Sequence, residues 1–290
     1  MRALRWFAAL ALVVAMAGCT GGNRSGSAPA PSTSVDVTLA AQVPAAVRSA
    51  GALTVATDPI YEPSEFRIDD KTVSGFDVDL FNAVAGKLGL KTDWRTAKFD
   101  DIIPGVGSGK YHIGISSFTI NAERLKQVTM VSYFSAGTQW AAKKDAGIKP
   151  DDACGKKVAV QTATVQVDDL TARSKTCTDA GKPAITMDQY QAQSDATSAV
   201  VSGKDDAMLA DSPVCAYAVK QTNGQLALVG DIYDSAPYGY VLPKDQTEFG
   251  TAIAAAVQAL IMDGSYKKIL DKWGLNATGA VTKSEINPAS

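Results

Sequence analysis

The sequence predicts a two-lobed α/β protein, and two observations lead to this fold class. Short apolar segments alternate with amphipathic segments in two series, one before about residue 140 and one after it. Such alternation indicates parallel strands covered by helices. Two longer extended segments, residues 138–143 and 226–242, can carry the chain to a second lobe and back. We therefore expect a first lobe from residues 51–140 and 238–276, and a second from residues 141–237.

The first series opens with an apolar strand, Leu53–Thr57, which runs into a turn that carries Pro59 and Pro63. A helix follows, for which Asp77 is a plausible N-cap and Gly89 a stop. In order, the further elements expected in this series are that helix at residues 76–88, a strand at 91–95, a short helix at 100–106 and a strand at 113–115.

The second series repeats the alternation. The expected strands are residues 157–160, 184–187 and 207–210, and the expected helices are residues 164–176, 194–202 and 213–220. Two amphipathic helices close the chain. Their apolar stripes are Phe249, Ile253, Val257 and Leu260 in the first, and Tyr266, Ile269, Leu270 and Trp273 in the second.

The N-terminus has the pattern of an export signal. Arg2 and Arg5 precede an apolar run at residues 6–17 that is too short to span a bilayer comfortably. The sequence Met-Ala-Gly-Cys that ends at Cys19 resembles the lipobox of bacterial lipoproteins, which implies a signal peptide at residues 1–18 and a lipid, palmitate included, on Cys19. The alternative is an ordinary secretory signal with an incidental cysteine. Residues 19–50 are expected to be a lipidated tether, flexible in its Gly-, Ser- and Pro-rich part, and residues 277–290 a tail.

Charge and composition exclude several partners. The chain has 28 basic and 30 acidic residues, and removal of residues 1–18 leaves 26 against 30, a formal charge of −4. A weak charge without a basic stripe argues against nucleic acid. The single histidine and the cysteine spacing do not suit a metal site, and no cofactor motif is visible. We expect a monomer without cofactor or metal.

The cysteines point to one disulfide bond. Cys154 stands just before the strand at residues 157–160, and Cys177 follows the helix that packs back on that strand. Both therefore lie at the same end of the unit, where a bridge is geometrically natural, and export permits it. Cys215, in an apolar helical start, is expected to be a buried thiol.

Polar residues follow the strands, where ligands of open α/β sheets bind. Ser116, Ser117 and Thr119 end one strand and precede Arg124, whose planar fork of donors matches a carboxylate. Asp211 ends another strand, so that Arg124 and Asp211 provide one charge for each end of a zwitterion. The plainer alternatives are a surface turn with an exposed Arg124 and a helix N-cap at Asp211.

Several motifs in order resemble the extracellular solute-binding proteins of polar amino-acid ABC importers. They are residues 57–63 (Thr-Asp-Pro-Ile-Tyr-Glu-Pro), 75–80 (Gly-Phe-Asp-Val-Asp-Leu), 102–104 with 109–111, 119–124 (Thr-Ile-Asn-Ala-Glu-Arg), and 205–207 with Asp211. The resemblance covers about residues 51–275. It implies a periplasmic-binding-protein-like fold of type II with two hinge crossings, and a binding protein rather than an enzyme, which hands a polar L-amino acid to a transporter permease.

The resemblance also implies roles for residues. Arg124 should grip the ligand carboxylate, helped by Thr119 and by the backbone around Thr164, and Asp211 should hold the α-ammonium beside Ser116 and Ser117. The ligand side chain should lie between Tyr61 and Phe99, with Asp58 at its far end. Tyr61 and Phe99 have the alternative of ordinary core residues. Ala163 stands where the family often has glycine.

Other functions remain open at this point. Some relatives on this fold are dehydratases that use a cleft carboxylate as general acid, and a ligand sensor for a membrane receptor is a third possibility. The carboxylate of Asp58 favours a ligand with an amide or basic side chain over an acidic one. Asp77 and Asp79 look like a carboxylate pair, but a capped helix start explains them better.

Overall fold

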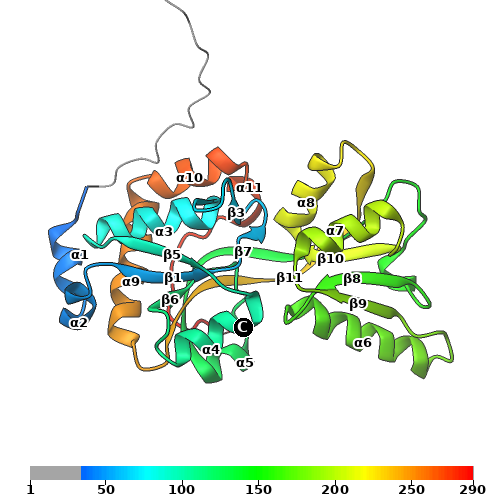
Figure 1. Cartoon of the computed structure of the whole chain (residues 1–290), viewed down its shortest axis with the longest axis horizontal. Coiled ribbons are helices and arrows are strands. Elements are labelled where there is room, and N and C mark those ends of the chain that lie inside the picture. Colours follow the sequence, from blue (N-terminus) through cyan, green and yellow to red (C-terminus); the bar gives the residue numbers. More distant parts are fainter. Residues whose placement is uncertain (1–33, 290) are drawn as a thin grey trace, which may run out of the picture.

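The computed structural model describes residues 34–289, which form two α/β lobes joined by two long strands, β7 (Val128–Lys143) and β11 (Leu226–Pro243) (Figure 1). The lobe that holds both described ends of the chain comprises α1 (Val37–Gln42), α2 (Ala45–Ser49), β1 (Leu53–Thr57), β2 (Ile60–Tyr61), β3 (Glu65–Arg67), β4 (Val73–Ser74), α3 (Phe76–Lys87), β5 (Thr92–Thr96), α4 (Phe99–Gly107), β6 (Ile113–Gly114), α5 (Ala122–Gln127), α9 (Thr247–Met262), α10 (Ser265–Trp273) and α11 (Asn276–Gly279). The other lobe comprises a 3₁₀ turn (Pro150–Asp152), β8 (Lys157–Gln161), α6 (Val165–Asp179), β9 (Thr186–Tyr190), α7 (Gln193–Ser202), β10 (Ala207–Asp211) and α8 (Ser212–Gln221).

One sheet runs through both lobes in the order β5-β1-β6-β11-β7-β10-β8-β9. The antiparallel pair β7 and β11 lies at its centre. Parallel pairing joins β1 to β5 and β6 on one side, and β8 to β9 and β10 on the other. The expected alternation and its parallel strands are confirmed, and the carboxyl ends of β1, β6, β8 and β10 carry the polar residues singled out above. The division of the chain into lobes at residues 140 and 238 stays a prediction.

The crossing strands are longer and more continuous than expected. β7 begins at Val128, ten residues before the expected extended segment. The sequence did not predict this start because residues 128–142 are almost all buried and show no alternation of polar and apolar side chains. The register of β11 against β7 shifts at points between Val229 and Gly239, where the chain passes from one lobe to the other. A Cβ at Gly137 would lie 2.5 Å from the carbonyl oxygen of Tyr233. Glycine is therefore needed for the close approach of the two strands at this point.

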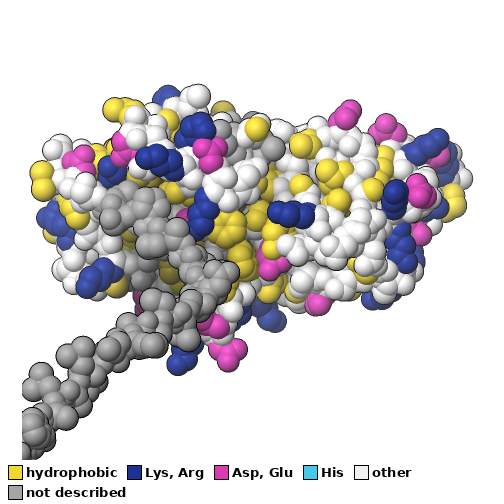
Figure 2. All heavy atoms as spheres, turned by 90° about the horizontal axis from the view of Figure 1, so that it is seen from above, with side chains coloured by type: hydrophobic (Ala, Val, Ile, Leu, Met, Phe, Trp, Pro, Cys, Tyr) yellow, Lys and Arg dark blue, Asp and Glu magenta, His cyan; other side chains and the backbone are white. Residues whose placement is uncertain are grey.

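The hydrophobic core is divided between the lobes. In the first lobe the sheet packs against α3, α9 and α10, through buried side chains such as Phe81, Phe249 and Leu270. In the second lobe both faces of the sheet are covered, one by α7 and α8 and the other by α6. On the face seen in Figure 2, basic and acidic side chains are interspersed, in keeping with the small net charge.

The expected cap of α3 is wrong. The N-cap is Gly75, and Asp77 lies inside the first turn, fully buried. Its carboxylate accepts hydrogen bonds from Ser117 and Tyr133, which are distant in sequence. Asp79 lies on the opposite side of the helix and accepts from Lys272 Nζ at 2.7 Å. The expected turn at residues 58–63 also differs, since it contains β2, which forms a small sheet with β3 and β4.

The expected extents of the tether and tail need correction. The Asp36 carboxylate caps α1 by accepting from the N–H of Thr38, and Val43 between α1 and α2 is buried, so that residues 36–49 belong to the folded lobe. The tail also packs, because the N–H of Ser132 in β7 donates to the carbonyl of Glu285. The predicted signal peptide and Cys19 lie outside the described residues. Within residues 34–289, no helix has the length and apolarity that crossing a membrane requires.

The predicted disulfide is present. Cys154 and Cys177 are bonded, with their Cα atoms 5.6 Å apart, and they tie the start of the β8 unit to the end of α6. Cys215 is a buried free thiol, as expected, and its Sγ donates to the carbonyl of Gln139.

We expect the Cys154→Ala/Cys177→Ala variant to lose about 3 kcal/mol of unfolding free energy, because the bridge restricts the unfolded chain over a loop of this length. Urea unfolding followed by circular dichroism measures the loss against the oxidised wild type. A loss below about 1 kcal/mol would contradict the chain-entropy explanation.

Candidate functional site

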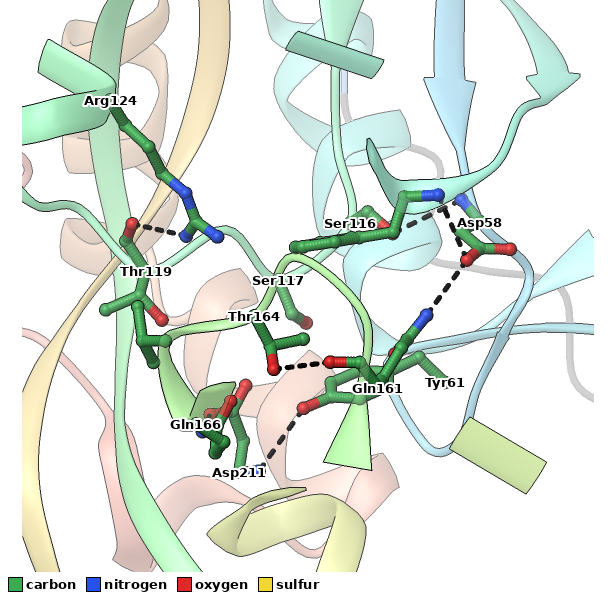
Figure 3. Close-up of a pocket in the computed structure, with 12 residues that line it drawn as sticks. Asp58, Tyr61, Ser116, Ser117, Thr119, Arg124, Gln161, Thr164, Gln166 and Asp211 are labelled. Carbon is green, nitrogen blue, oxygen red and sulfur yellow. Dashed lines mark hydrogen bonds between the residues drawn. The ribbon is translucent and has the colours of Figure 1, made fainter. Parts of the chain in front are cut away.

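A narrow pocket lies where the two lobes meet, at the carboxyl ends of the parallel strands (Figure 3). All nine residues that the sequence singled out for the ligand line it, together with three others. The full set is Asp58, Tyr61, Phe99, Ser116, Ser117, Thr119, Arg124, Gln161, Thr164, Val165, Gln166 and Asp211. Their contact with a ligand stays a prediction.

Arg124 is buried at the start of α5, so the alternative of an exposed surface arginine is wrong. Asn121 is the N-cap of this helix, and its side chain accepts from the N–H of Arg124 at 2.9 Å. The guanidinium donates through Nη1 to the carbonyl of Thr119 at 2.7 Å and through Nη2 to the carbonyl of Ala163 in the other lobe at 3.3 Å. Burial lowers the pKa of Arg124 to about 10, which leaves it charged at neutral pH.

Aromatic rings support this guanidinium. Its Cζ lies 5.6 Å from the ring centre of Phe99 and 5.3 Å from that of Phe118. The two rings are stacked with their centroids 4.5 Å apart. Cation–π attraction of this kind helps to hold a buried cation in place. Phe99 therefore packs against other side chains, as expected if it were an ordinary core residue. It also forms part of the pocket wall.

Asp211 provides the opposite charge. Its carboxylate accepts from the hydroxyl of Tyr238 at 2.7 Å and from Gln166 Nε2 at 2.9 Å. Burial raises the pKa of Asp211, while these hydrogen bonds and the charge of Arg124 oppose the rise. Asp211 occupies the N-cap position of α8, but its side chain makes no capping hydrogen bond, so the capping alternative does not explain the carboxylate.

Asp58 directly follows β1 and lies on the other side of the pocket from Arg124 (Figure 3). Its Oδ2 accepts from the N–H of Phe99 at 3.2 Å and from Gln161 Nε2 at 3.1 Å. Burial raises the pKa of Asp58 to about 7, and the negative charge of Asp100 adds to the rise. A carboxylate in this state gains from any cation that enters the pocket.

The hydroxyl groups after β6 are directed inward to buried acids. The Ser116 hydroxyl donates to Glu65 Oε1 at 2.9 Å, and the Ser117 hydroxyl donates to Asp77 Oδ2 at 3.2 Å. The backbone of Ser117 has a φ of +50°, which is uncommon for residues other than glycine. Such backbone conformations are frequent at functional sites. Thr119 contacts Arg124 through its carbonyl.

The start of α6 offers backbone N–H groups to the pocket. Thr164 is the N-cap, but its hydroxyl donates to the carbonyl of Gln161 at 2.8 Å and does not cap the helix. Val165 and Gln166, the first helical residues, line the pocket. The N-terminus of a helix favours an anion. Ala163 takes the left-handed φ of +63° that a glycine would take, so the departure from the family leaves its carbonyl facing Arg124.

Several contacts join the lobes across the pocket. They include the Asp58–Gln161 and Arg124–Ala163 hydrogen bonds, and the hydrogen bond that the N–H of Asp211 donates to the Tyr61 hydroxyl at 3.2 Å. The Tyr61 side chain is buried, as expected if it were an ordinary core residue, but it also lines the pocket. Among the residues of the described chain, no group of three or more His, Cys, Asp or Glu side chains could hold a metal ion.

The sequence interpretation missed Gln161, Val165 and Gln166. The predicted strand ended at Val160, one residue before Gln161, which is the last residue of β8. The rule that polar residues at strand ends line the site would have found it. Gln166 is two residues beyond Thr164 on the first turn of α6, where a side chain can turn toward Asp211.

Two α/β lobes with a pocket between them, and one opposite charge on each side of it, define a binding protein for a small charged solute. The family model for the bacterial extracellular solute-binding proteins, family 3, matches residues 53–276. The chain belongs to this family.

Relatives agree with this assignment. The chain is 38% identical over 252 residues to the arginine-binding protein ArgT of Corynebacterium glutamicum, covering 86% of this chain and 82% of ArgT. It is 27% identical over 231 residues to the L-cystine-binding protein TcyJ of Escherichia coli, covering 78% and 84%. A solved structure of an ancestral arginine-binding protein bound to arginine has a TM-score of 0.71 at 34% identity, covering 77% of this chain and 98% of that one.

A further solved structure is that of an ancestral amino acid-binding protein, AncCDT-1, a precursor of cyclohexadienyl dehydratase. Its TM-score is 0.71 at 31% identity, and it covers 79% of this chain and 97% of that one. The predicted two-lobed, periplasmic-binding-protein-like fold is confirmed by these neighbours.

Proposed function

We propose that this protein binds a cationic L-amino acid, L-arginine above all, outside the cytoplasmic membrane and delivers it to an ABC transporter permease. The observation that carries the proposal is the placement of three charges around one pocket. Arg124 and Asp211 suit the head of an amino acid, and the carboxylate of Asp58 is left for the side chain. The hydrogen bonds to Asp58 come from a backbone amide and from the Gln161 amide, neither of which neutralises its charge.

The head of the ligand follows from the geometry. A carboxylate at the start of α6 would accept from Arg124, which is held toward Ala163, and from the free N–H groups of the helix. The α-ammonium would then lie by Asp211 and the serines after β6. Charge-assisted hydrogen bonds of this kind are stronger than neutral ones.

The side chain follows from Asp58 and the rings of Tyr61 and Phe99. Rings stack on the planar guanidinium of arginine, and a carboxylate can pair with it. The relatives named above support this choice, since ArgT and the ancestral protein are described as arginine-binding. Glutamine is the second ligand in this proposal, because a second solved structure, at 33% identity, is that of an ancestral arginine-binding protein bound to glutamine.

Delivery requires that the ligand favour one arrangement of the lobes. A ligand held by both lobes binds best when they are closed, and so shifts the population toward closure. We further propose that the mature protein is a monomer, anchored to the membrane by lipid on Cys19, and that it performs no chemistry on its ligand. Recovery of unchanged L-arginine by NMR after prolonged incubation tests the last point against the dehydratase alternative.

The Arg124→Ala variant should bind L-arginine more weakly by about 2–5 kcal/mol, because the ligand carboxylate would lose its charged partner in a buried site. Titration calorimetry on both proteins measures the difference. Arg173→Ala, which removes an arginine of the second lobe outside the pocket lining, serves as the control. An Arg124→Ala variant with wild-type affinity would overturn the proposed orientation of the head.

The preference for L-arginine over L-glutamine should rise with pH and level off above about 7, the pKa of Asp58 in this structure. Below that value a neutral ligand side chain leaves Asp58 protonated, whereas a cationic one favours the carboxylate. The ratio of the two affinities can change by up to about tenfold per pH unit. Calorimetry with both ligands between pH 5 and pH 8 measures the ratio, and Asp58→Asn should make it independent of pH. A wild-type ratio that is constant over this range would count against Asp58 as the side-chain partner.

Lipid on Cys19 should place the wild-type protein in the membrane fraction, and Cys19→Ser should release it. Mass spectrometry of the N-terminal peptide would show an acylated cysteine only in the wild type. Equal membrane association and an unmodified peptide in both proteins would refute the anchor.

A further inference from the structure

Two buried acids lie directly behind the serines of the pocket. Glu65 on β3 and Asp77 on α3 have no exposed surface. Glu65 Oε1 accepts from the Ser116 hydroxyl at 2.9 Å. Asp77 Oδ2 accepts from the N–H of Ser117 at 3.0 Å, from its hydroxyl at 3.2 Å and from the Tyr133 hydroxyl at 2.8 Å.

One shared proton would satisfy both acids. Their side chains interact, and one oxygen of each, Glu65 Oε2 and Asp77 Oδ1, is buried without a hydrogen-bond partner. Burial, followed by the negative charge of Asp77, raises the pKa of Glu65 well above its usual range, which favours the proton on Glu65. The other titratable groups that act on the pair are Asp58, Tyr133 and Tyr240, none of which carries a positive charge.

This arrangement fixes the direction of the serine hydroxyls. A backbone N–H can only donate, so the oxygen of Asp77 that receives the N–H of Ser117 is an acceptor, and the Ser117 hydroxyl must donate to it as well. The Ser116 hydroxyl donates a hydrogen bond to Glu65. It accepts a hydrogen bond from the N–H of Asp58 at 3.2 Å. The remaining lone pairs of both hydroxyls are free for the pocket that Ser116 and Ser117 line.

We propose that Glu65 and Asp77 are positioning residues that, by sharing one proton, turn the Ser116 and Ser117 hydroxyls into hydrogen-bond acceptors for the ligand α-ammonium. The inference deepens the proposed function and rests on it in one respect, that the ligand carries an α-ammonium. With Asp211, the hydroxyls give the three N–H donors of that group an acceptor each. A hydroxyl that can no longer donate rejects a ligand with an acceptor at this position, such as an α-keto acid.

Amide variants of the two acids test this arrangement. In Glu65→Gln the amide oxygen can accept from Ser116 while its NH₂ donates to Asp77. In Asp77→Asn the amide oxygen can accept from Ser117 while its NH₂ donates to Glu65. Each single variant thus keeps one donor between the pair. In the double variant the two NH₂ groups face each other without an acceptor, so one amide must rotate. Its NH₂ group then faces the neighbouring serine, whose hydroxyl must accept from it and point its own hydrogen into the pocket.

The affinity for L-arginine and for L-glutamine is measured by calorimetry for wild type, both single variants and the double variant. We expect each single variant to lose less than about tenfold, since an amide is a weaker acceptor than a carboxylate. The double variant should lose at least a further tenfold beyond the product of the single losses. Asp79→Asn, the same change on the outer side of α3, serves as the control and should bind as wild type does.

Losses that simply multiply in the double variant would overturn the proposal, as would a Glu65→Gln loss as large as that of the double variant. Thermal melting establishes that each variant is folded. Should the double variant not fold, Ser117→Ala decides, because its affinity must fall at least tenfold, and a change below twofold would refute the role of the hydroxyl. Both ligands share the α-ammonium, so a wild type that prefers glutamine corrects only the proposed ligand, whereas a wild type that binds neither refutes the proposed function itself.

Discussion

The structure of the pocket depends on keeping one arginine charged while it is buried between two lobes. Removal of a guanidinium from water is costly unless its donors are satisfied. In this protein the carbonyls of Thr119 and Ala163 accept two of the five donors, and the rings of Phe99 and Phe118 lie against the cation. One of these carbonyls comes from each lobe, so the guanidinium is fully held only when the lobes meet. The same requirement leaves the remaining donors for an anion that enters from the pocket.

Negative charge outweighs this one cation around the pocket, and the protein controls it in different ways. Asp211 is held by Tyr238 and Gln166, and Asp58 by an amide of each lobe. Glu65 and Asp77 hold one proton between them, so that the pair contributes one negative charge instead of two. The pocket wall is therefore acidic on balance, which matches a ligand with an excess positive charge. The hydrogen-bond partners of Asp211 and Asp58 are uncharged, so they do not compete with a cationic ligand for these carboxylates.

Local patterns predicted what is local in this fold. The ends of β1, β6, β8 and β10 follow from short apolar runs bounded by polar residues, and because parallel strands end at one edge, Asp58, Ser116, Thr164 and Asp211 could be placed together in advance. The continuity of β7 could not, since a strand buried on both faces shows no alternation. Asp77 was mistaken for a helix cap because the capping pattern considers only neighbouring residues. Its hydrogen-bond partners, Ser117 and Tyr133, are 40 and 56 residues away in the sequence.

The long strands explain how such a pocket can also release its ligand. β7 and β11 are the two connections between the lobes, and their register is irregular where they cross, next to Gly137. The hydrogen bonds across the pocket join amides, carbonyls and a hydroxyl that water can satisfy when the lobes part. These hydrogen bonds therefore add little net free energy to closure, and in the proposed binding mode a zwitterion that bridges Arg124 and Asp211 would add the differential affinity that shifts the population. A stronger direct pairing of the two lobes would close the pocket without a ligand and would deprive the permease of a signal that the protein is loaded.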